Sequence, residues 1–445
     1  MNKFLENSIF HRRLGYNYPL ITHGKGIYLY DENGKKYIDG TGGVLAVNIG
    51  HGVREMAERA KELALKHGYL HGSQFSTKGM EDYANELCSV MPKDLNMVFF
   101  ISGGSEGNES AIKLAKQYLY DSGDKEKNIV ISRRPAYHGG TTFILNFSTK
   151  IDSKKPFIPW LNNFPSIPAP FCYHCPYKKT YPKCKLECAW ALEKAIQKAD
   201  PNKVAAFITE TIIGSTAPAV VPPHGYLSVI REICDKYNVL LIFDEVMTGF
   251  GRTGRWLACQ HWKVTPDIAV VGKGIGGGLV PLAAVFCKNK IVKTIQKGSG
   301  NFNHGFTFQN NPFTTGMGME VLKYVKKHDL VKNSAVKGKY LLSKLSTLQN
   351  LDMVGEVRGL GLMVGLELVE DKKKRMPFPK EKRIAVKVVQ AAFRRRLNIL
   401  FGNGYLKNGQ GDAILIGPPF IVTKKEIDKI VEIIRESILE VQNNK

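Results

Sequence analysis

The stretch that decides the fold is Val-Leu-Leu-Ile-Phe-Asp-Glu at residues 239–245, an apolar run closed by two acids. Such a run is typical of a strand buried on both faces of a sheet, with the acids at its carboxyl end. A second apolar run, at residues 268–271, is followed by Lys273 in a glycine-rich segment. Open α/β sheets bind ligands just outside the carboxyl ends of their strands, so Asp244 and Lys273 are expected in one crevice.

A lysine and an aspartate placed in this way suit pyridoxal phosphate (PLP). The lysine amine can form a Schiff base with the aldehyde of PLP, and the carboxylate can keep the pyridine nitrogen protonated. The protonated ring then accepts the electrons released at the substrate's Cα. The alternative interpretation is a salt bridge at a strand end beside an ordinary glycine-rich loop.

The composition indicates a globular protein. The chain has 445 residues, of which 43% are hydrophobic and 23% charged, and its length predicts two lobes. Its formal net charge of +23 suggests nucleic-acid binding, but the lysines are spread along the chain and no nucleic-acid motif accompanies them. We therefore expect a solvated lysine-rich surface that attracts anionic substrates. With no signal-peptide core and no run of ~20 apolar residues, we expect a cytoplasmic chain with neither membrane nor nucleic-acid partners.

Other predicted strands also end in candidate site residues. Residues 97–101 lead through Gly104 and Ser105 into a helix at residues 108–120, a pattern that binds phosphate through free backbone N–H groups or forms a simple tight turn. The strand at residues 128–131 leads to Tyr137 and His138, where an aromatic ring beside glycines can stack on a cofactor or simply pack. The strand at residues 204–208 ends in Thr209 and Glu210, a further acid at a carboxyl end.

An irregular insertion at residues 153–190 contains four of the eight cysteines. Their spacing, Cys172-x2-Cys175-x8-Cys184-x3-Cys188, resembles a structural zinc site or a pair of redox-sensitive thiols. The gap between the two pairs is shorter than in zinc ribbons, and reduced packing thiols are the alternative. We therefore assign no metal ligand. The other four cysteines are scattered, as expected for reduced core thiols.

The remaining pattern gives the outline of the fold. A hairpin is predicted at residues 21–40 around Asn33-Gly34, followed by two helices within residues 53–91. A helix is expected at residues 312–327. Beyond it, helices and strands alternate, at residues 331–348, 354–368, 380–396, 413–416 and 423–442. This alternation predicts a separate α/β lobe with its own sheet.

Together these motifs resemble the class III (subgroup II) aminotransferases, PLP enzymes of fold type I, over nearly the whole chain. The matching segments follow the family's order. They are residues 26–31, 50–51, 102–108, 137–139, 210–225, 243–254, 270–274, 305–311 and 418–420. The most specific are Asp244-Glu245-Val246, the glycine-rich segment at residues 249–254, and Lys273.

The resemblance implies an α/β fold, with a large domain built on a mixed, mostly parallel sheet and a smaller α/β domain. On this basis residues 56–328 form the large PLP-binding domain, including the cysteine insertion at about 153–190. Residues 329–445 form the small domain, and residues 1–55 pack with it. The family builds its site at a dimer interface, so a homodimer or a dimer of dimers is implied.

The resemblance also implies residue roles. Lys273 would form the Schiff base with PLP and then move the proton between Cα and C4′, while Asp244 would pair with the pyridine nitrogen. Tyr137 would stack on the ring, and Glu210 would lie near the phenolic oxygen. The implied cofactor-binding residues are Gly104, Ser105, Tyr137, His138, Glu210, Asp244, Val246, Lys273 and Thr307. Of these, Gly104 and Ser105 would bind the phosphate, which Thr307 would reach from the partner subunit.

Several positions depart from the family's pattern. Leu415 stands where many members have an arginine for the substrate carboxylate, and Asn408, next to Lys407, stands where amine:pyruvate members have a mobile arginine. Leu45 lies near the position of a tryptophan in those members, and Met247 replaces a frequent glutamine. The cofactor machinery therefore matches the family while the usual carboxylate anchors do not.

The resemblance implies a PLP-dependent aminotransferase that transfers an amino group from an ω-amino acid or amine to a keto acid such as pyruvate or 2-oxoglutarate. An amino-acid racemase or epimerase, or a phospho-lyase, would use the same fold and cofactor. A more distant alternative is a nucleotide-binding protein that uses residues 272–278 as a phosphate loop, or a basic nucleic-acid binder. An aminotransferase requires a keto acid in stoichiometric amounts, and this requirement distinguishes it from the alternatives.

Overall fold

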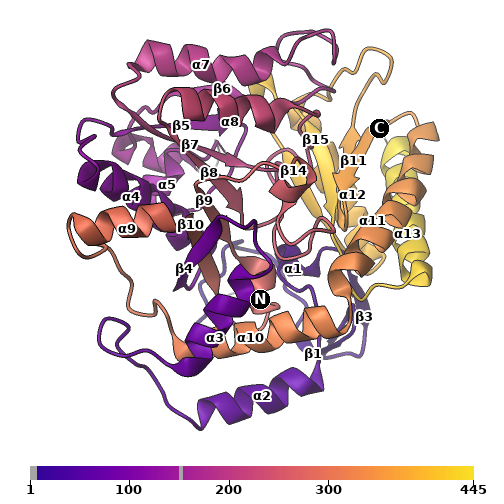
Figure 1. Cartoon of the computed structure of the whole chain (residues 1–445). Coiled ribbons are helices and arrows are strands. Elements are labelled where there is room, and N and C mark those ends of the chain that lie inside the picture. The colour runs from indigo at the N-terminus through magenta and orange to yellow at the C-terminus, as the bar shows by residue number, and fades with distance from the viewer. Residues whose placement is uncertain (1–7, 150–153, 445) are drawn as a thin grey trace.

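The apolar runs in the middle of the chain assemble into one seven-stranded sheet (Figure 1). The computed structural model describes residues 8–149 and 154–444. The strand order is β4-β10-β9-β8-β7-β5-β6. The bounds are β4 Leu95–Ile101, β5 Ile129–Arg134, β6 Ser166–Pro168, β7 Val204–Glu210, β8 Leu240–Glu245, β9 Ile268–Val271 and β10 Ala283–Lys288. β10 pairs antiparallel with both β4 and β9, and the pairs among β5 to β9 are parallel. The predicted mixed, mostly parallel sheet is confirmed.

Helices cover both faces of this sheet because its strands are apolar on both sides. Leu241 and Phe243 of β8 belong to the core cluster that includes helices α7 (Glu187–Ala199) and α8 (Tyr226–Lys236). Leu240 and Ile242 point to the opposite cluster. That cluster includes residues of α4 (Gly104–Asp121), α5 (Thr142–Leu145) and α9 (Asn289–Lys297). The apolar run of β8 is thus the centre of a three-layer structure.

Two smaller sheets complete the described part of the chain. The first, β11-β12-β15-β14, is antiparallel, and α11, α12 and α13 belong to the same C-terminal region (Figure 1). Its elements are α11 Leu330–Ser346, β11 Val354–Leu360, β12 Met363–Leu368, α12 Ile384–Arg394, β14 Leu400–Asn403, β15 Asp412–Ile416 and α13 Lys424–Asn443. The second has the order β1-β2-β3-β13, with β1 Ile21–Lys25, β2 Tyr28–Asp31, β3 Lys36–Asp39 and β13 Leu397–Asn398.

The second small sheet joins the two ends of the chain, since β3 pairs in parallel with β13. The hairpin at Asn33-Gly34 forms as predicted, with Gly34 at a φ of 72°. The remaining helices are α1 Gly42–Leu45, α2 Arg54–Ala64, α3 Lys78–Cys88 and α10 Pro312–Lys327. α10 packs against α2 and α3. The domain boundaries at residues 55/56 and 328/329 stay a prediction.

Some elements differ from the sequence-based expectations. The helix expected at residues 108–120 begins earlier, at Gly104, because the glycine-serine turn is itself the first helical turn. Strand β10 and helices α7, α8 and α9 were not predicted from the sequence pattern. Short 3₁₀ segments also occur, among them η4 (Lys273–Gly276) and η7 (Lys407–Gly409). Among the described residues, no helix combines the length and the apolar character that crossing a membrane requires.

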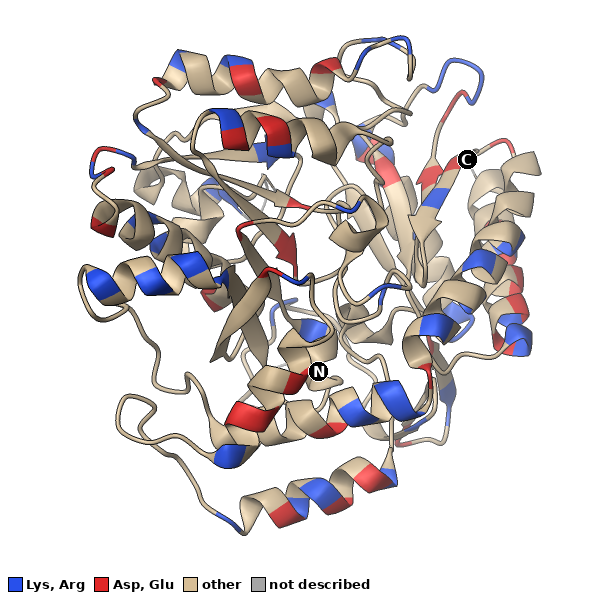
Figure 2. Cartoon of the chain, in the orientation of Figure 1, with Lys and Arg blue, Asp and Glu red and all other residues tan. Residues whose placement is uncertain are grey.

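Basic residues are distributed widely over the fold. Figure 2 shows lysine and arginine on helices from every region, often beside aspartate or glutamate. Many of these neighbours form ion pairs on exposed helix surfaces, such as Lys78 with Asp82 and Arg54 with Glu58. The excess positive charge is therefore spread over the surface and partly compensated, as the sequence predicted.

Candidate active site

The predicted site residues gather at one edge of the central sheet. β5, β7, β8 and β9 are mutually parallel, and β4 runs in the same direction because β10 is antiparallel to both β4 and β9. Their carboxyl ends therefore share one edge. The residues at or just beyond these ends are Gly104 and Ser105 (β4), Tyr137 and His138 (β5), Glu210 (β7), Asp244 and Val246 (β8) and Lys273 (β9). Asp244 pairs with Val270 in register, and Glu210 pairs with Asp244. Strand topology alone thus unites distant parts of the sequence.

Lys273 begins the short helix η4, directly after Gly272. Its φ of 50° lies in the left-handed region, which is unusual for a residue with a side chain. Desolvation lowers the pKa of its amine from 10.5 to about 8, while the nearby carboxylates of Asp244 and Glu210 act in the opposite direction. At pH 7 roughly a tenth of the amine is therefore neutral, far more than for an ordinary lysine, and the neutral form is the nucleophile.

Asp244 is buried and held by groups from separate segments. Its Oδ2 accepts hydrogen bonds from Nδ2 of Asn108 at 2.8 Å and from Nδ1 of His138 at 2.8 Å. Its Oδ1 accepts one from the backbone N–H of Val246 at 3.0 Å. These donors stabilise the ionised carboxylate and fix its direction. Nε2 of His138 is buried and has no partner among the described residues.

Glu210 forms a second buried acid beside Asp244. Its two carboxylate oxygens accept hydrogen bonds from the backbone N–H groups of Tyr137 at 3.1 Å and Gly214 at 2.7 Å. Nη2 of Arg133 donates to its backbone carbonyl at 2.7 Å. Burial raises the pKa of the Glu210 carboxyl, although the charge of His138 opposes that effect. The side chain is thus rigidly placed next to Tyr137.

The N-terminus of α4 forms an anion cradle. The first backbone N–H groups of a helix have no partner within it, and no side chain of the described residues caps α4. Gly139, with a φ of 140°, approaches this turn so closely that a Cβ there would lie 2.6 Å from Oγ of Ser105. A Cβ on Gly104 would likewise lie 2.8 Å from the Val246 side chain. Small residues therefore keep the turn open for a ligand.

These features fit PLP. Free amides at a helix N-terminus match its phosphate, a rigid buried carboxylate matches its pyridine nitrogen, and a lysine of lowered pKa matches its aldehyde. The ring of Tyr137, 42% exposed, is available for stacking. All of these groups come from one edge of one sheet.

Two residues of this site were not singled out from the sequence. Asn108 links Asp244 to the backbone carbonyl of His138, to which its Nδ2 donates at 2.7 Å. Arg133 is fully buried under Glu210. The signal for Asn108 was its place in the first turns of a helix that has an apolar inner face. Arg133 closes an apolar strand, a weaker signal.

Among the described residues, no hydrogen bond joins Thr307 to this group. This residue occupies an exposed turn before α10, as does Phe308. Its role at the phosphate of the partner subunit stays a prediction.

The positions that depart from the family's pattern are mostly apolar and buried. Leu45 and Leu415 belong to one small cluster with Ile212 and Met363, against which Met247 packs. Leu45 has a φ of 64°, and a Cβ on Gly417 would lie 2.9 Å from its Cγ. Lys407, the cation next to Asn408, is exposed in η7. Leu45 and Leu415 are thus part of one buried apolar cluster.

The cysteine insertion shows no preformed metal centre. All eight cysteines are free, and the described residues contain no group of three or more His, Cys, Asp or Glu side chains that could hold a metal ion. His174, between Cys172 and Cys175, instead contacts buried Glu367 at 3.1 Å. Glu367 also accepts a hydrogen bond from Tyr405 and pairs with Arg358. This network attaches the insertion to the C-terminal sheet.

Comparison with known proteins identifies the family. The sequence model described as aminotransferase class-III matches residues 12–438. The chain belongs to the class III aminotransferases. Enzymes of this class use PLP and have fold type I, so the fold, cofactor and reaction class implied by the sequence motifs are confirmed.

The relatives of this aminotransferase cover nearly its whole length. It is 39% identical over 428 residues to the uncharacterized aminotransferase YodT of Bacillus subtilis, covering 96% of each chain. It is 31% identical to a putrescine–pyruvate aminotransferase of Pseudomonas aeruginosa, covering 94% of this chain and 90% of the other. The structure of an amine transaminase from an uncultivated Pseudomonas species, in the PLP-bound internal aldimine form, superposes with a TM-score of 0.89 at 29% identity. It covers 98% of this chain and 97% of that one.

Proposed function

We propose that this aminotransferase takes amino groups from an amine or an ω-amino acid and passes them to pyruvate or 2-oxoglutarate. The observation that carries the proposal is the apolar cluster of Leu45, Ile212, Met363 and Leu415, in which Leu415 stands where many members of the family have an arginine. An apolar cluster cannot pair with a buried carboxylate, so it favours donors that carry no carboxylate next to the amino group. Similarity to an amine transaminase and to a putrescine–pyruvate aminotransferase supports the same substrate class.

The proposed roles of the site residues follow from their environment. When bound, PLP supplies an aldehyde that joins amino groups and a ring that takes up electrons from the substrate's Cα. Lys273, with its pKa lowered to about 8, holds the cofactor and later carries the proton at Cα and C4′. Asp244, fixed by Asn108 and His138, supplies the negative charge that faces the pyridine nitrogen.

The remaining groups bind and orient. Backbone N–H groups of Gly104 and Ser105 hold the phosphate at the positive end of α4. Tyr137 stacks on one side of the ring, and Val246, next to Gly104 and Gly272, covers the other. Glu210 lies near the phenolic oxygen, in the orientation set by the backbone N–H groups of Tyr137 and Gly214.

We further propose a cytoplasmic homodimer or dimer of dimers. Several large apolar side chains are exposed in the single chain, including Phe75 at 61% and Phe308 at 57%. Phe308 stands edge-on to Tyr69, with ring centroids 5.8 Å apart, so these two side chains form one exposed patch. Exposed apolar patches of this kind mark protein–protein contacts. Burial of the patch in a dimer would carry Thr307, beside Phe308, toward the partner subunit.

A substrate panel tests the proposal. The purified holoenzyme is assayed with amines, ω-amino acids and α-amino acids, each against pyruvate and 2-oxoglutarate. We expect turnover with amines or ω-amino acids, and one molecule of keto acid consumed per donor. Product formation without consumption of keto acid would indicate racemisation or elimination instead. Turnover confined to α-amino acids would contradict the proposed donor class.

A further inference from the structure

The loop that follows α9, residues 298–311, carries Thr307 and is anchored on both sides of it. On the C-terminal side, the backbone N–H of Asn310 donates to the carbonyl of Phe100 at 3.0 Å. The backbone N–H of Phe100 in turn donates to Oδ1 of Asn310 at 3.1 Å. This anchor fixes the loop to the end of β4, beside the cradle at Gly104. We call residues 298–311 the Thr307 loop.

The other anchor is His304, which contacts α4. Its Nδ1 lies 3.1 Å from Nζ of Lys113, and its Nε2 lies 2.8 Å from Oγ of Ser110. A lysine ammonium can only donate, so Nδ1 must accept and Nε2 must carry the proton. The Ser110 hydroxyl then receives that hydrogen bond and donates its own proton to the carbonyl of Glu106 at 2.7 Å. The contacts therefore define a neutral imidazole in a single tautomer.

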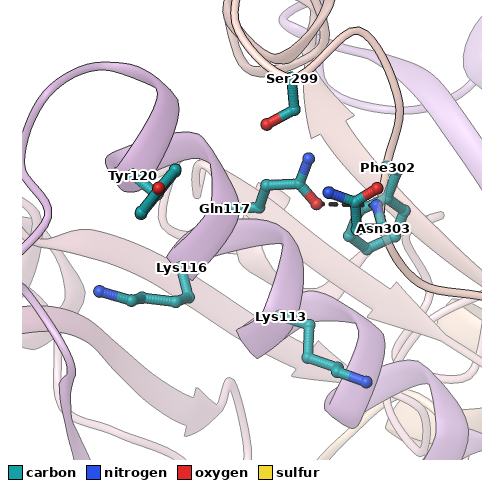
Figure 3. A pocket seen from close by; sticks show the side chains of 7 residues that line it. All are labelled: Lys113, Lys116, Gln117, Tyr120, Ser299, Phe302 and Asn303. Carbon is teal, nitrogen blue, oxygen red and sulfur yellow. Dashed lines mark hydrogen bonds between the residues drawn. The ribbon is translucent and has the colours of Figure 1, made fainter.

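Between His304 and α9, the loop spans a hollow against α4. Figure 3 shows this pocket, of about 310 Å³, lined by Lys113, Lys116, Gln117, Tyr120, Ser299, Phe302 and Asn303. Gln117 reaches across it: its Nε2 donates to the carbonyl of Asn301 at 2.6 Å, and its Oε1 accepts from the N–H of Asn303 at 2.9 Å. At the hollow these two hydrogen bonds of Gln117 join the loop to α4.

We propose that His304 is a positioning residue for cofactor binding, which acts through Thr307 on the cofactor phosphate of the partner subunit. The inference rests on the proposed dimeric site. His304 precedes and Asn310 follows the exposed turn of Thr307, so the two anchors fix where that turn stands. α4 thus contributes to both phosphate sites of the dimer. Its N-terminus binds the phosphate of its own subunit, and its outer face positions Thr307, which reaches the phosphate of the partner subunit.

The charges around His304 make the anchor sensitive to acid. Lys113 and Glu109 of α4 face it, together with the rings of Phe99, Phe302 and Phe306. Desolvation lowers the pKa of His304, and Lys113 lowers it further, against the opposing charge of Glu109. Protonation would remove the acceptor of Lys113 and place two cations side by side. The anchor therefore weakens as the pH falls below the ordinary histidine pKa of about 6.5.

The test measures PLP affinity rather than turnover. Cofactor-free protein is titrated with PLP, for wild type and for the variants Thr307→Ala, His304→Ala, His304→Gln and the double alanine variant. Exposed His224 provides the matched control His224→Gln, which we expect to bind as wild type does. Glutamine at position 304 can accept from Lys113 and donate to Ser110 but does not titrate.

We expect Thr307→Ala and His304→Ala each to weaken PLP binding by roughly tenfold to a hundredfold, as for one lost charge-assisted hydrogen bond. The double variant should bind no more weakly than Thr307→Ala, because His304 acts through that residue. His304→Gln should bind like wild type at about pH 8 and lose less affinity below about pH 6.5.

Two results would overturn the proposal in distinguishable ways. If Thr307→Ala binds PLP as wild type does, the proposed contact across the dimer is wrong, and the positioning role fails with it. If Thr307→Ala weakens binding but His304→Ala does not, or if the two losses add fully, the dimeric site stands and the role of His304 is refuted. Equal acid sensitivity of wild type and His304→Gln would also refute it.

Discussion

Asp244 receives hydrogen bonds from Asn108, His138 and the backbone of Val246, which come from three segments of the chain. The sequence pattern indicated that Asp244 ends a buried strand, and the family resemblance supplied its role. Neither the pattern nor the resemblance revealed that Asn108 and His138 contact Asp244. Both contacts depend on how α4 and the segment after β5 approach the sheet. Patterns along the chain locate catalytic groups, while the groups that orient them come from tertiary packing.

Replacement of Asp244 by asparagine isolates its charge. Asp244→Asn keeps the shape of the side chain but removes the negative charge that faces the pyridine nitrogen. We expect kcat to fall by about 10²-fold or more, the scale for removing one electrostatic stabiliser. Circular dichroism should show an unchanged fold. Near-normal kcat in a folded variant would mean that the carboxylate is structural.

Removal of the Lys273 amine tests the attachment of the cofactor. Lys273→Ala should abolish turnover and leave no covalent link to PLP after borohydride reduction, since the amine is the reacting group. Mass spectrometry of the reduced protein measures this directly. Lys407→Ala, which changes an exposed lysine, serves as the control and should retain the adduct. An adduct in the Lys273→Ala protein would disprove the assignment.

At the scale of elements, apolar runs and turn residues predicted most of the fold. The predicted helix at residues 312–327 coincides with α10, and the strands β8 and β9 lie side by side as expected. Strand β10 was not predicted. Its apolar run follows closely after a glycine-rich segment, and nothing in the run indicates that the strand is antiparallel to its neighbours. Helix α7 was not predicted either, because left-handed Leu186 begins this helix without a capping side chain.

The close approach of Gly139 to α4 gives a prediction at this scale. A Cβ at Gly139 would lie 2.6 Å from Oγ of Ser105, and its φ of 140° is strained for other residues, so Gly139→Ala must displace the first turn of α4. We expect PLP binding to weaken at least about tenfold, as when phosphate contacts are lost. The neighbouring Gly140 has open space around its Cβ direction, and Gly140→Ala is the control. Equal affinities for the two variants would show that the turn tolerates displacement.

At the scale of the whole molecule, the lowered pKa of Lys273 couples protonation to folding. In cofactor-free protein the folded pKa is about 8, against the ordinary value of 10.5, so the unfolded chain binds more protons between these values. The contribution of Lys273 to stability therefore rises with pH across this window. Compared with Lys273→Met, which cannot titrate, wild type should be less stable at pH 7, and the gap should close as the pH approaches 10.5.

Urea unfolding of both cofactor-free proteins across this pH range measures the difference. A gap that stays constant with pH would show that the amine is not desolvated in the folded protein. Circular dichroism and fluorescence should report coincident transitions before free energies are compared.

The pairing of β3 with β13 sets the order in which the molecule can be completed. Asn398 donates a hydrogen bond to Asp39 at a sequence separation of 359 residues. A ribosome adds roughly 5–20 residues per second, so the N-terminal hairpin waits on the order of tens of seconds for its partner strand. During that time its free edge is open to pairing with other chains. Synthesis therefore exposes the nascent chain to misassembly until β13 has emerged and paired with β3.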